Sequence, residues 1–552
     1  MSLQIQSIPE VPEETRRVAR AAFPKGNRWI SLRDELGAIY TDEDFADLFP
    51  QRGQPAAAPW RLALVMIFQY AEGLSDEQAE NALRSRIDWK YALSLSLEDP
   101  GLDASVLSEF RARLVAGGAE ARLLDKLLVL CRERKWLRDR GRQRTDSTQV
   151  LAAVRQLNRL EHSGETLRHA LNTLAVVDPD WIRAHAQAEW IERYQTRMDD
   201  YHLPRSESQR QELAITIGQD GEQLLQAIYA PEAPAYLRSI PAVNTLRQVW
   251  IQQYVPTETG VLWRDAKEHG LSPAPVGIRS PHDPEARYSE KRSTGWVGYK
   301  VHLTETCDED LPRLITQVET TMAPVPDSEA LPGIQENLAA RELLPARQLV
   351  DSGYVTSRRL VSSQKHQIDL YGPARAENSW QAQADEGFAA ADFRFDWAQQ
   401  QARCPSGQQS SSWETAKDDY GKEQVKIKFA VSVCRPCPQR TQCTKIDRRI
   451  LTIQPEAEFR ALEAARQRMQ TKEYAKSYAQ RAGVEGAISQ TVRQSGLRRA
   501  RYVGLTKTHL QHQLIAAATN VVRLINWITD VPLAKTRLSA FGKVMRPEPL
   551  PC

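Results

Sequence analysis

Three acidic residues of this 552-residue chain stand out because of what surrounds them. Asp146 falls in the β-branched segment RTDSTQVLAAV, Asp351 ends the apolar run of RQLVDSGYV, and Glu485 lies in a helical pattern near clustered arginines. A carboxylate at the end of an apolar strand is costly to bury unless it is paired or binds a metal. Three carboxylates brought together would repel one another unless a divalent cation neutralised them. Two Mg²⁺ or Mn²⁺ ions about 3.5–4 Å apart would suit such a set and would promote in-line phosphoryl displacement, with ordinary caps and salt bridges as the alternative for these acids.

Basic residues are concentrated near these acids, although the formal net charge of the whole chain is only +3. Residues 132–144 hold seven basic and two acidic side chains, and eleven basic residues face three acidic ones from Arg481 onward. Arg498, Arg499 and Arg501 crowd together within that stretch. Clustered guanidinium groups grip phosphate oxygens, so the pattern predicts salt-sensitive nucleic-acid binding. A solvated helix face is the alternative for either run taken alone.

The first 130 residues predict a helical module. Ser75 stands three residues before Gln78, which is the spacing of a capping box, and a further helix is expected to open near Asp103. In that helix the apolar residues share one face and Arg111 lies elsewhere. Such a module could dock DNA through exposed arginines or could serve packing or dimerisation, and the sequence leaves both open.

The segments around Asp146 and Asp351 predict a mixed α/β sheet. A strand at 144–154 is followed, after a helical stretch and the loop SPAPVGIRSPHDPEARYSEKRST, by the hairpin GYKVHLTETC and RLITQVETTMA. A helix at 328–343, the strand RQLVDSGYV, another helix and the strand IDLYGP come next. That order of elements indicates a mixed sheet with covering helices. Residues 156–250 have helical periodicity, whereas 376–455 are poor in apolar residues, so both read as insertions. The last strong helix carries a core-facing stripe of Leu510, Leu514, Ala517, Val521 and Leu524.

Four motifs together resemble bacterial insertion-sequence transposases of the Asp-Asp-Glu (DDE) class. They are TDSTQV, GYKVH, LVDSGY and the string Tyr478-x2-Arg481-x3-Glu485. The likeness is greatest to the insertion-sequence 1182-type group, in which this string leads into a continuation similar to GLRRARYVGL. The stretch GLSDEQAENALRSRIDWKYALSL also resembles the helical domain that precedes the catalytic core in that group. The likeness extends over most of the chain.

The resemblance implies a ribonuclease-H-like core in which Asp146, Asp351 and Glu485 bind two divalent ions. Tyr478 and Arg481 fall on positions where the family contacts DNA phosphate near the cleavage point. The family string calls for Lys seven residues after the Glu, but this chain has Val492 there, and Arg493 is the nearest substitute. The implied reaction is hydrolysis of a phosphodiester at the element's end, followed by attack of the freed 3′-hydroxyl on target DNA.

The predicted architecture is therefore a ribonuclease-H-like mixed α/β core with an N-terminal all-helical domain and two insertions. In order, the predicted parts are a helical domain for DNA binding or assembly (1–130), the first core strand (131–155), a helical insertion (156–274), the hairpin and later strands of the core (275–375), a cysteine-containing insertion (376–455), the C-terminal core helices (456–530) and a basic tail (531–552).

Four cysteines in the second insertion have spacing that suits zinc. Cys434-x2-Cys437-x5-Cys443 follows Cys404 by thirty residues, and a CxxC pair lets two sulfurs reach one tetrahedral ion. Only one CxxC is present, and no histidine lies nearby. A structural zinc site, a redox cluster and buried free thiols all remain open.

Two residues near the predicted hairpin are weaker candidates. Asp283, in HDPEARYSEK, could assist metal or DNA binding, although an Asp before Pro more often forms a turn. Lys300 could meet DNA, with a solvated lysine on an edge strand as the alternative.

The expected partners are the element's terminal inverted repeats and target DNA, bound by a homodimer. No window approaches about 18 uninterrupted apolar residues, which argues against a membrane span. The N-terminal residues lack a basic-then-apolar signal pattern, so we expect a cytoplasmic, nucleoid-associated bacterial protein. Two alternatives remain: a domesticated DNA-binding protein without catalysis, and a metal-dependent nuclease that cuts DNA without joining it.

Overall fold

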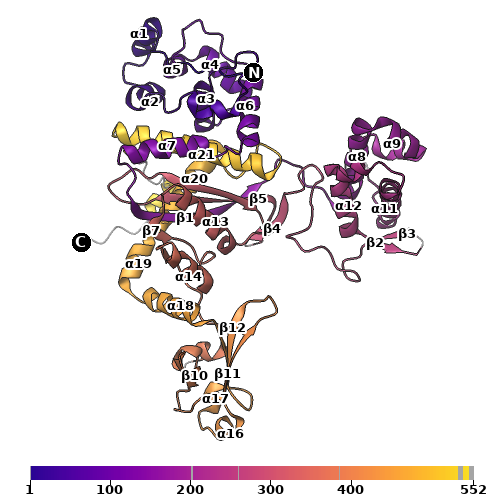
Figure 1. Ribbon diagram of the computed structural model, residues 1–552, viewed down its shortest axis with the longest axis vertical. Helices are drawn as coiled ribbons and strands as arrows, with labels where there is room; N and C mark the ends of the chain where they lie inside the picture. The colour runs from indigo at the N-terminus through magenta and orange to yellow at the C-terminus, as the bar shows by residue number, and fades with distance from the viewer. Residues whose placement is uncertain are drawn as a thin grey trace. The chain divides into compact units, whose positions relative to one another are not determined.

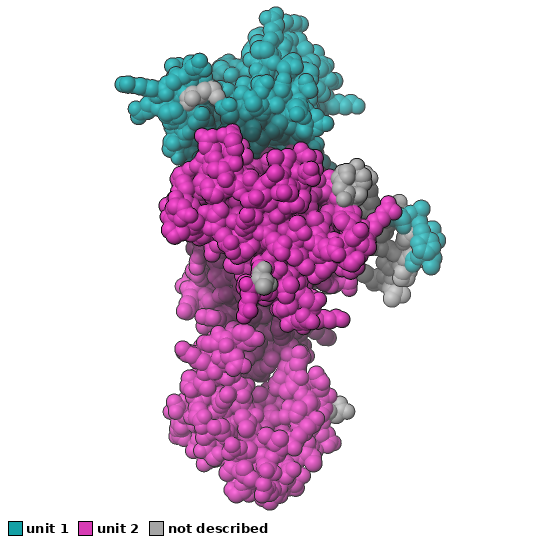
Figure 2. All heavy atoms as spheres, turned by 90° about the vertical axis from the view of Figure 1, so that its right-hand side faces the viewer, with its two compact units in different colours: residues 1–117, 312–314, 517–552 teal, residues 118–311, 315–516 magenta. Residues whose placement is uncertain are grey.

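The computed structural model describes residues 2–199, 203–258, 260–291, 293–384, 386–532 and 539–545. The chain divides into two compact units, one of residues 1–117, 312–314 and 517–552, and one of residues 118–311 and 315–516 (Figure 2). The seven predicted parts are a finer division than these two units, and their boundaries stay predictions. Within the described ranges, no helix combines the length and apolar character needed to cross a bilayer.

The first unit is helical, as its periodicity predicts. Two of the predicted helix starts are confirmed, because Ser75 and Gln78 form a reciprocal capping box and Asp103 caps the next helix but one. Its core is aromatic, with the rings of Trp29 and Phe68 centred 4.1 Å apart and the Trp89 ring 5.2 Å from that of Phe68. The elements are α1 (Glu13–Ala22), α2 (Arg28–Leu36), η1 (Glu43–Leu48), α3 (Pro59–Glu72), α4 (Asp76–Ser85), α5 (Ile87–Ala92), α6 (Ala104–Ala116) and α22 (Ala540–Val544).

One arginine of this module is not the exposed side chain that the sequence suggests. Arg111 on α6 is buried, and its guanidinium forms an ion pair with Asp76 at the start of α4. The pairing satisfies a buried charge and joins two helices of the unit. Arg111 is therefore a structural residue, and the expectation that it lies exposed on this module is wrong.

Six strands form the central sheet of the second unit. β1 lies in the middle, antiparallel to β5 on one side and parallel to β7 on the other. β8 continues the parallel pairing beyond β7, while β4 and β6 both pair antiparallel with β5. The strands are β1 (Arg140–Leu151), β4 (Arg287–Lys291), β5 (Thr294–Thr306), β6 (Ile315–Met322), β7 (Pro345–Leu349) and β8 (Asp369–Tyr371) (Figure 1).

The two faces of this sheet are covered by different helices. Thr145 accepts a hydrogen bond from Gln348, whose own amide oxygen accepts one from Gln335 on α13. The next-door side chain, Arg144, donates instead to the backbone oxygen of Gln480, just before α20. Because successive side chains of a strand point to opposite faces, α13 and α20 cover opposite sides of β1. The helices around the sheet are α7 (Arg122–Glu133), α13 (Asp327–Ala340), α14 (Ser357–Lys365), α18 (Glu456–Met469), α19 (Lys472–Tyr478), η5 (Ala479–Ala482), α20 (Gly483–Ser495) and α21 (Leu505–Ile528).

The first predicted insertion is helical, as expected, and has its own buried core. The side chain of Asp220 accepts hydrogen bonds from Trp190, Arg193 and Tyr194, which ties two of its helices together. Its last part forms a short hairpin that the periodicity did not predict. The elements are α8 (Arg159–Val177), α9 (Pro179–His185), α10 (Ala188–Tyr194), α11 (Glu207–Tyr229), η3 (Ala235–Ser239), α12 (Pro241–Gln253), β2 (Tyr254–Thr257) and β3 (Gly260–Trp263).

The second predicted insertion is built from short strands and single helical turns. A three-stranded sheet and a two-stranded sheet enclose a small apolar cluster that includes Ile427 and Phe429. Trp397 and Trp413 pack against this cluster, with their rings centred 5.1 Å apart. The elements are α15 (Trp380–Gln383), η4 (Ala390–Asp392), β9 (Arg394–Asp396), β10 (Gln401–Arg403), β11 (Ser412–Lys417), β12 (Glu423–Lys428), α16 (Val431–Cys434), α17 (Arg440–Cys443) and β13 (Ile450–Ile453).

Most predicted elements around the sheet are confirmed, with one correction. The hairpin, the strands around Asp146 and before Asp351, and the apolar stripe of α21 all form. The segment before the hairpin, however, is not wholly a loop, because Arg287–Lys291 forms β4 against the first residues of β5. The sequence did not predict β4 because the segment is polar and rich in proline, which is common where a strand pairs along only one edge.

Candidate active site

Asp146 and Asp351 are brought together by the register of two parallel strands. Arg144 of β1 lies opposite Leu349 of β7, and each aspartate stands two residues beyond this pair. Since side chains two residues apart on a strand point to the same face, both aspartates lie on the face of Arg144 and Leu349, toward the carboxyl ends of the two strands. Asp351 lies in the turn after β7, where its Oδ1 accepts the backbone N–H of Gly353 at 2.8 Å. The predicted placement of Asp351, at the end of a strand and the start of a turn, is confirmed.

Glu485 joins the two aspartates from a helix. It lies in the first turn of α20, and Arg481 is in the 3-10 turn that precedes it. One open pocket of the second unit is lined by all three acids together with Tyr478 and Arg481. Other side chains lining this pocket include Ser147, Thr148, Lys291, Ser352, Ser489, Val492, Arg493 and Arg498.

Arg481 bridges two of the acids. Its guanidinium lies 2.7 Å from Oδ2 of Asp146 and 3.2 Å from Oε1 of Glu485. Burial raises the pKa of Asp146 to about 6, although Arg481 opposes the shift and the nearby Asp351 adds to it. Burial is thus the main reason that the Asp146 carboxyl holds its proton more readily than a solvated one.

The turn that carries Arg481 is fixed to the sheet by a buried arginine that the sequence reading missed. Arg144 donates to both Oε1 of Glu305 at 2.8 Å and the backbone oxygen of Gln480 at 2.6 Å. Gly483 begins α20 directly over this guanidinium, and a Cβ there would collide with it. Arg144 thus positions the start of α20, and with it Arg481 and Glu485. Its position two residues before Asp146, on the same face of β1, is the only signal in the sequence.

Tyr478 is held by a stack of aromatic rings. Its ring lies 5.5 Å from that of Tyr474 at an angle of 9°, and Tyr474 in turn stacks on Tyr371 of β8 at 4.8 Å. Such offset stacks fix ring orientation as well as burying apolar area. Burial raises the pKa of the Tyr478 phenol. Arg481 opposes this shift, and the three acids of the pocket add to it. The hydroxyl therefore stays protonated and available as a hydrogen-bond donor at the edge of the pocket.

The predicted phosphate-binding arginines divide into two groups. Arg493 and Arg498 line the pocket with the acids, and Arg498 is oriented by a hydrogen bond from its Nε to Thr148 Oγ1 at 2.8 Å. Arg499 and Arg501 follow Arg498 closely but do not line the pocket. The backbone at Arg499 instead pairs alongside the end of β1, through a parallel bridge to Leu151. A DNA-binding role for Arg499 and Arg501 remains a prediction.

Lys300, which the sequence suggests as a DNA contact, does not line the pocket of the three acids, whereas Lys291 does. Lys300 lies on β5, a strand paired on both edges, and its Nζ donates to Val325 O at 2.8 Å and pairs with Asp327 at 3.0 Å. It is not a solvated edge lysine, and that alternative is wrong. Lys291, at the end of β4, lines the pocket and lowers the pKa of Asp146. It was missed because β4 was read as a loop.

Asp283 is buried away from the pocket. Its Oδ1 accepts the hydroxyl of Tyr299 at 2.6 Å, and its backbone oxygen accepts the N–H of Ala286 in a turn. Its side chain is fully buried. The turn-forming interpretation of this residue fits these contacts.

The carboxylates suit hard divalent cations by chemistry. They supply only oxygen ligands, and the raised pKa of Asp146 marks a place where added positive charge would be stabilising. Among the described residues, however, no three His, Cys, Asp or Glu side chains already surround a common point as metal ligands would. The exposed Glu485, whose side chain is 65% accessible, is the carboxylate with most freedom to move.

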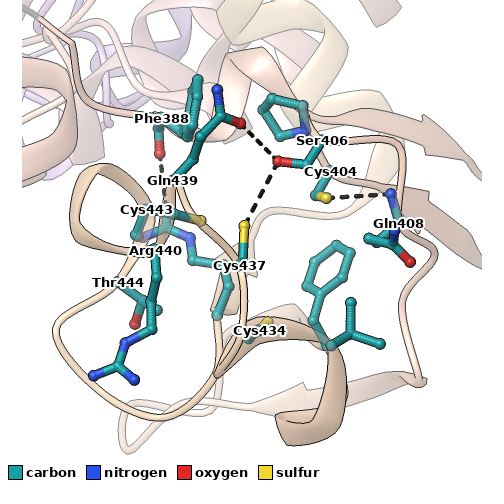
Figure 3. A pocket seen from close by; sticks show the side chains of 14 residues that line it. Phe388, Cys404, Ser406, Gln408, Cys434, Cys437, Gln439, Arg440, Cys443 and Thr444 are labelled. Atoms are coloured by element: carbon teal, nitrogen blue, oxygen red, sulfur yellow. Dashed lines mark hydrogen bonds between the residues drawn. The ribbon is translucent and has the colours of Figure 1, made fainter.

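The four cysteines of the predicted zinc site line a second pocket, in the small-stranded insertion (Figure 3). All four sulfurs are free thiols. Their arrangement is separate from the pocket that contains the three acids, and no residue lines both.

Two family profiles match the chain. A profile described as a transposase DDE domain matches residues 403–525, and one described as a transposase domain (DUF772) matches residues 17–113. The first match contains Arg481 and Glu485 and also the four cysteines, while Asp146 and Asp351 lie outside both. The curated proteins contain no match to the chain. The two profile matches support a DDE transposase.

Proposed function

We propose that the chain cleaves the ends of an insertion sequence and joins them to target DNA at the pocket of Asp146, Asp351 and Glu485. The observation that carries the proposal is the convergence of three carboxylates, separated in the chain by up to 339 residues, on one pocket with arginines on its rim. Two Mg²⁺ or Mn²⁺ ions held by these carboxylates would supply Lewis-acid charge and lower the pKa of an attacking water. The insertion-sequence 1182-type group is the part of the transposase class to which we assign it.

The topology supports a ribonuclease-H-like core for this proposal. Three antiparallel strands (β6, β5, β1) are followed in space by two strands parallel to β1 (β7, β8). Asp146 on the central strand and Asp351 after its parallel neighbour then occupy adjacent positions, and α20 brings the third acid.

Arg481 has two roles in the proposed reaction. In the metal-free protein it offsets part of the charge on Asp146 and Glu485 through its ion pairs. Its Nε is buried and has no hydrogen-bond partner among the described residues. The terminal N–H groups that now pair with the carboxylates could instead take a DNA phosphate oxygen once the carboxylates are otherwise neutralised. Tyr478 would donate its hydroxyl to the same backbone.

The basic rim would position DNA. Arg493, Arg498 and Lys291 lie on the lining of the same pocket, and each can neutralise one phosphate without reading sequence. Binding energy from these contacts orients the phosphodiester relative to the carboxylates, which is the main protein contribution to phosphoryl transfer. We expect a homodimer on paired element ends.

The test uses the full chain and a DNA fragment that carries the gene with its native flanking sequence. Asp146→Asn, Asp351→Asn and Glu485→Gln should each lower Mg²⁺-dependent strand cleavage at least about 10²-fold. DNA binding, measured by fluorescence anisotropy in the absence of divalent ions, should stay within about threefold of wild type. Ser489→Ala, which changes an uncharged residue of the same lining, is the matched control.

A second arm of the experiment supplies pre-cut ends with a free 3′-hydroxyl and a circular target plasmid. Joined product from wild type, absent from the three variants, is the expected result. Cleavage without joining would identify a nuclease and overturn the strand-transfer part of the proposal. Cleavage at wild-type rate by Asp146→Asn and Asp351→Asn would overturn the assignment of the pocket.

A further inference from the structure

The small-stranded insertion has little apolar material for its size. Its two sheets hold two and three strands, and its fully buried apolar residues are Phe393, Ala402, Val425, Ile427, Phe429, Leu451 and Ile453. A core of this size contributes only about 3–5 kcal/mol, so small scaffolds of this kind usually need a cross-link. Cys404, Cys434 and Cys443 pack directly against that core.

Four cysteine side chains, one directly after β10 and three between residues 434 and 443, line the same pocket. Cys404 follows β10, Cys434 ends α16, Cys443 ends α17, and Cys437 lies in the link between those two turns (Figure 3). The rest of its lining combines apolar side chains such as Phe388 and Phe429 with polar ones that include Arg440. Because none of the four is in a disulfide, each sulfur is available as a ligand.

The backbone around Cys404 is shaped to hold a thiolate. Its Sγ accepts the backbone N–H of Gln408 at 3.3 Å, and the turn is closed by the N–H of Gly407 donating to the oxygen of Cys404 at 2.8 Å. Gly407 has a φ of +84°, which the tight turn requires and which side chains rarely adopt. A backbone N–H aimed at sulfur is the kind of outer hydrogen bond that orients a metal ligand.

A buried cation next to the thiols has no carboxylate at ion-pair distance. Arg449 is only 8% exposed, and it donates to the backbone oxygens of Cys443 at 2.9 Å and Phe388 at 3.4 Å. In the described ranges Glu377 acts on this guanidinium only from beyond ion-pair distance, and its Nε has no hydrogen-bond partner. Burying an uncompensated charge is strongly unfavourable, so this guanidinium calls for anionic neighbours.

We propose that Cys404, Cys434, Cys437 and Cys443 bind one structural zinc ion, and that Arg449 neutralises part of the charge of the resulting tetrathiolate. On binding, four S–H bonds are lost, four Zn–S bonds form and the protons leave to solvent. The product carries a net charge of about −2, which is the anion that Arg449 lacks. The four sulfurs do not yet surround a point within ligand distance, so each thiol turns about its χ1 when the ion enters.

The first test is the metal content of the full chain, expressed with zinc in the medium and purified without strong chelators. About one zinc per chain is expected, and replacement by Co²⁺ should give the thiolate charge-transfer and tetrahedral d–d absorption of a four-sulfur site. These two measurements need no variant and do not depend on DNA cleavage, so they stand apart from the proposed catalytic function. Zinc below about one-tenth per folded chain, or a Cys434–Cys437 disulfide found by mass spectrometry, would overturn the proposal.

Variants test the ligands and the arginine. Cys434→Ser with Cys437→Ser should reduce zinc to less than about one-tenth per chain, while Cys131→Ala, at a buried thiol of α7, should leave it unchanged. Arg449→Met should weaken zinc about tenfold in competition with a chromogenic chelator, because neighbours of a metal ligand typically affect affinity by that factor or more. The neighbouring Arg448→Met is the matched control. Full zinc retention by the double serine variant would contradict the assignment.

Discussion

Asp146 and Asp351 each lie two residues beyond the Arg144–Leu349 pair of two adjacent parallel strands. Their placement is therefore a consequence of strand register and needs no contact between the two carboxylates. A one-residue slip of β7 against β1 would turn Asp351 to the other face of the sheet. Glu485 has no such constraint from the sheet, and its position depends on how α20 is attached.

That attachment predicts different effects of adding a methyl group at two glycines of α20. Gly483→Ala places a Cβ against the buried Arg144 guanidinium, which cannot move without breaking its bonds to Glu305 and Gln480. We expect a loss of about 1–3 kcal/mol in the free energy of unfolding and faster hydrogen exchange in α20.

Gly486→Ala in the same helix is the matched control. A Cβ at Gly486 meets nothing within 4 Å, so this change should be neutral or stabilise the protein by about 0.5–1 kcal/mol. Urea unfolding and hydrogen exchange measure both variants. Equal effects at the two positions would show that Arg144 does not hold the start of α20.

Substitutions of Lys291 and Lys300 should have different effects: the first should weaken DNA binding, and the second should lower the free energy of unfolding. Lys291→Met removes a charge from the pocket lining, so DNA affinity should fall and the slope of log affinity against log salt should decrease by about 1, with unfolding unchanged. Lys300→Met leaves the largely buried Asp327 without its partner and should cost about 3 kcal/mol of stability.

The second substitution has its own control. Lys300→Met combined with Asp327→Asn should recover much of the lost stability, because the uncompensated charge is gone. Anisotropy at several salt concentrations and urea unfolding give the two readouts. A DNA-binding defect in Lys300→Met as large as that in Lys291→Met would contradict the placement of these lysines.

The sequence predicted the sheet better than it predicted the supports of the site. β1, β7 and the β5–β6 hairpin have β-branched or alternating patterns, and Asp351 interrupts an apolar run at the end of a strand. Arg144 could not be recognised as a support, because its partners Glu305 and Gln480 are 161 and 336 residues away. A local pattern carries no information about such distant pairings.

The two lysines illustrate the same limit. β4 has a polar composition because it pairs along only one edge, so Lys291 was read as part of a loop. Lys300 looks solvated in the sequence, but the start of α13 brings Asp327 to its amine. Element type follows from local periodicity, whereas the partners of a charge follow from the tertiary fold.

A buried histidine on α21 predicts acid sensitivity. Burial lowers the pKa of His512 to about 3, and its Nδ1 lies 2.9 Å from Thr320 Oγ1. The folded state keeps the ring neutral while the unfolded chain takes up a proton below about pH 6.5, so this contribution to stability is complete above that pH and is lost as the pH falls toward 3.

Between pH 7.5 and pH 5 the loss attributable to His512 should be about 2 kcal/mol. His512→Gln retains a polar contact for Thr320. Over this pH range its free energy of unfolding should fall by about 2 kcal/mol less than that of the wild type. His366→Gln, at a partly exposed ring, is the control for removal of a histidine elsewhere in the same unit. Identical pH profiles for wild type and His512→Gln would disprove the contribution.

The most direct measurement of the central claim is Mn²⁺ binding to the metal-depleted full chain, followed by the electron paramagnetic resonance of free Mn²⁺. We predict two bound ions in wild type, and loss of at least one of them in both Asp146→Asn and Asp351→Asn, with Ser489→Ala unchanged. Thiolates bind Mn²⁺ poorly, so the cysteine pocket does not contribute to this signal. Wild-type stoichiometry and affinity in a chain carrying both aspartate substitutions would show that the pocket is not the metal site of the reaction.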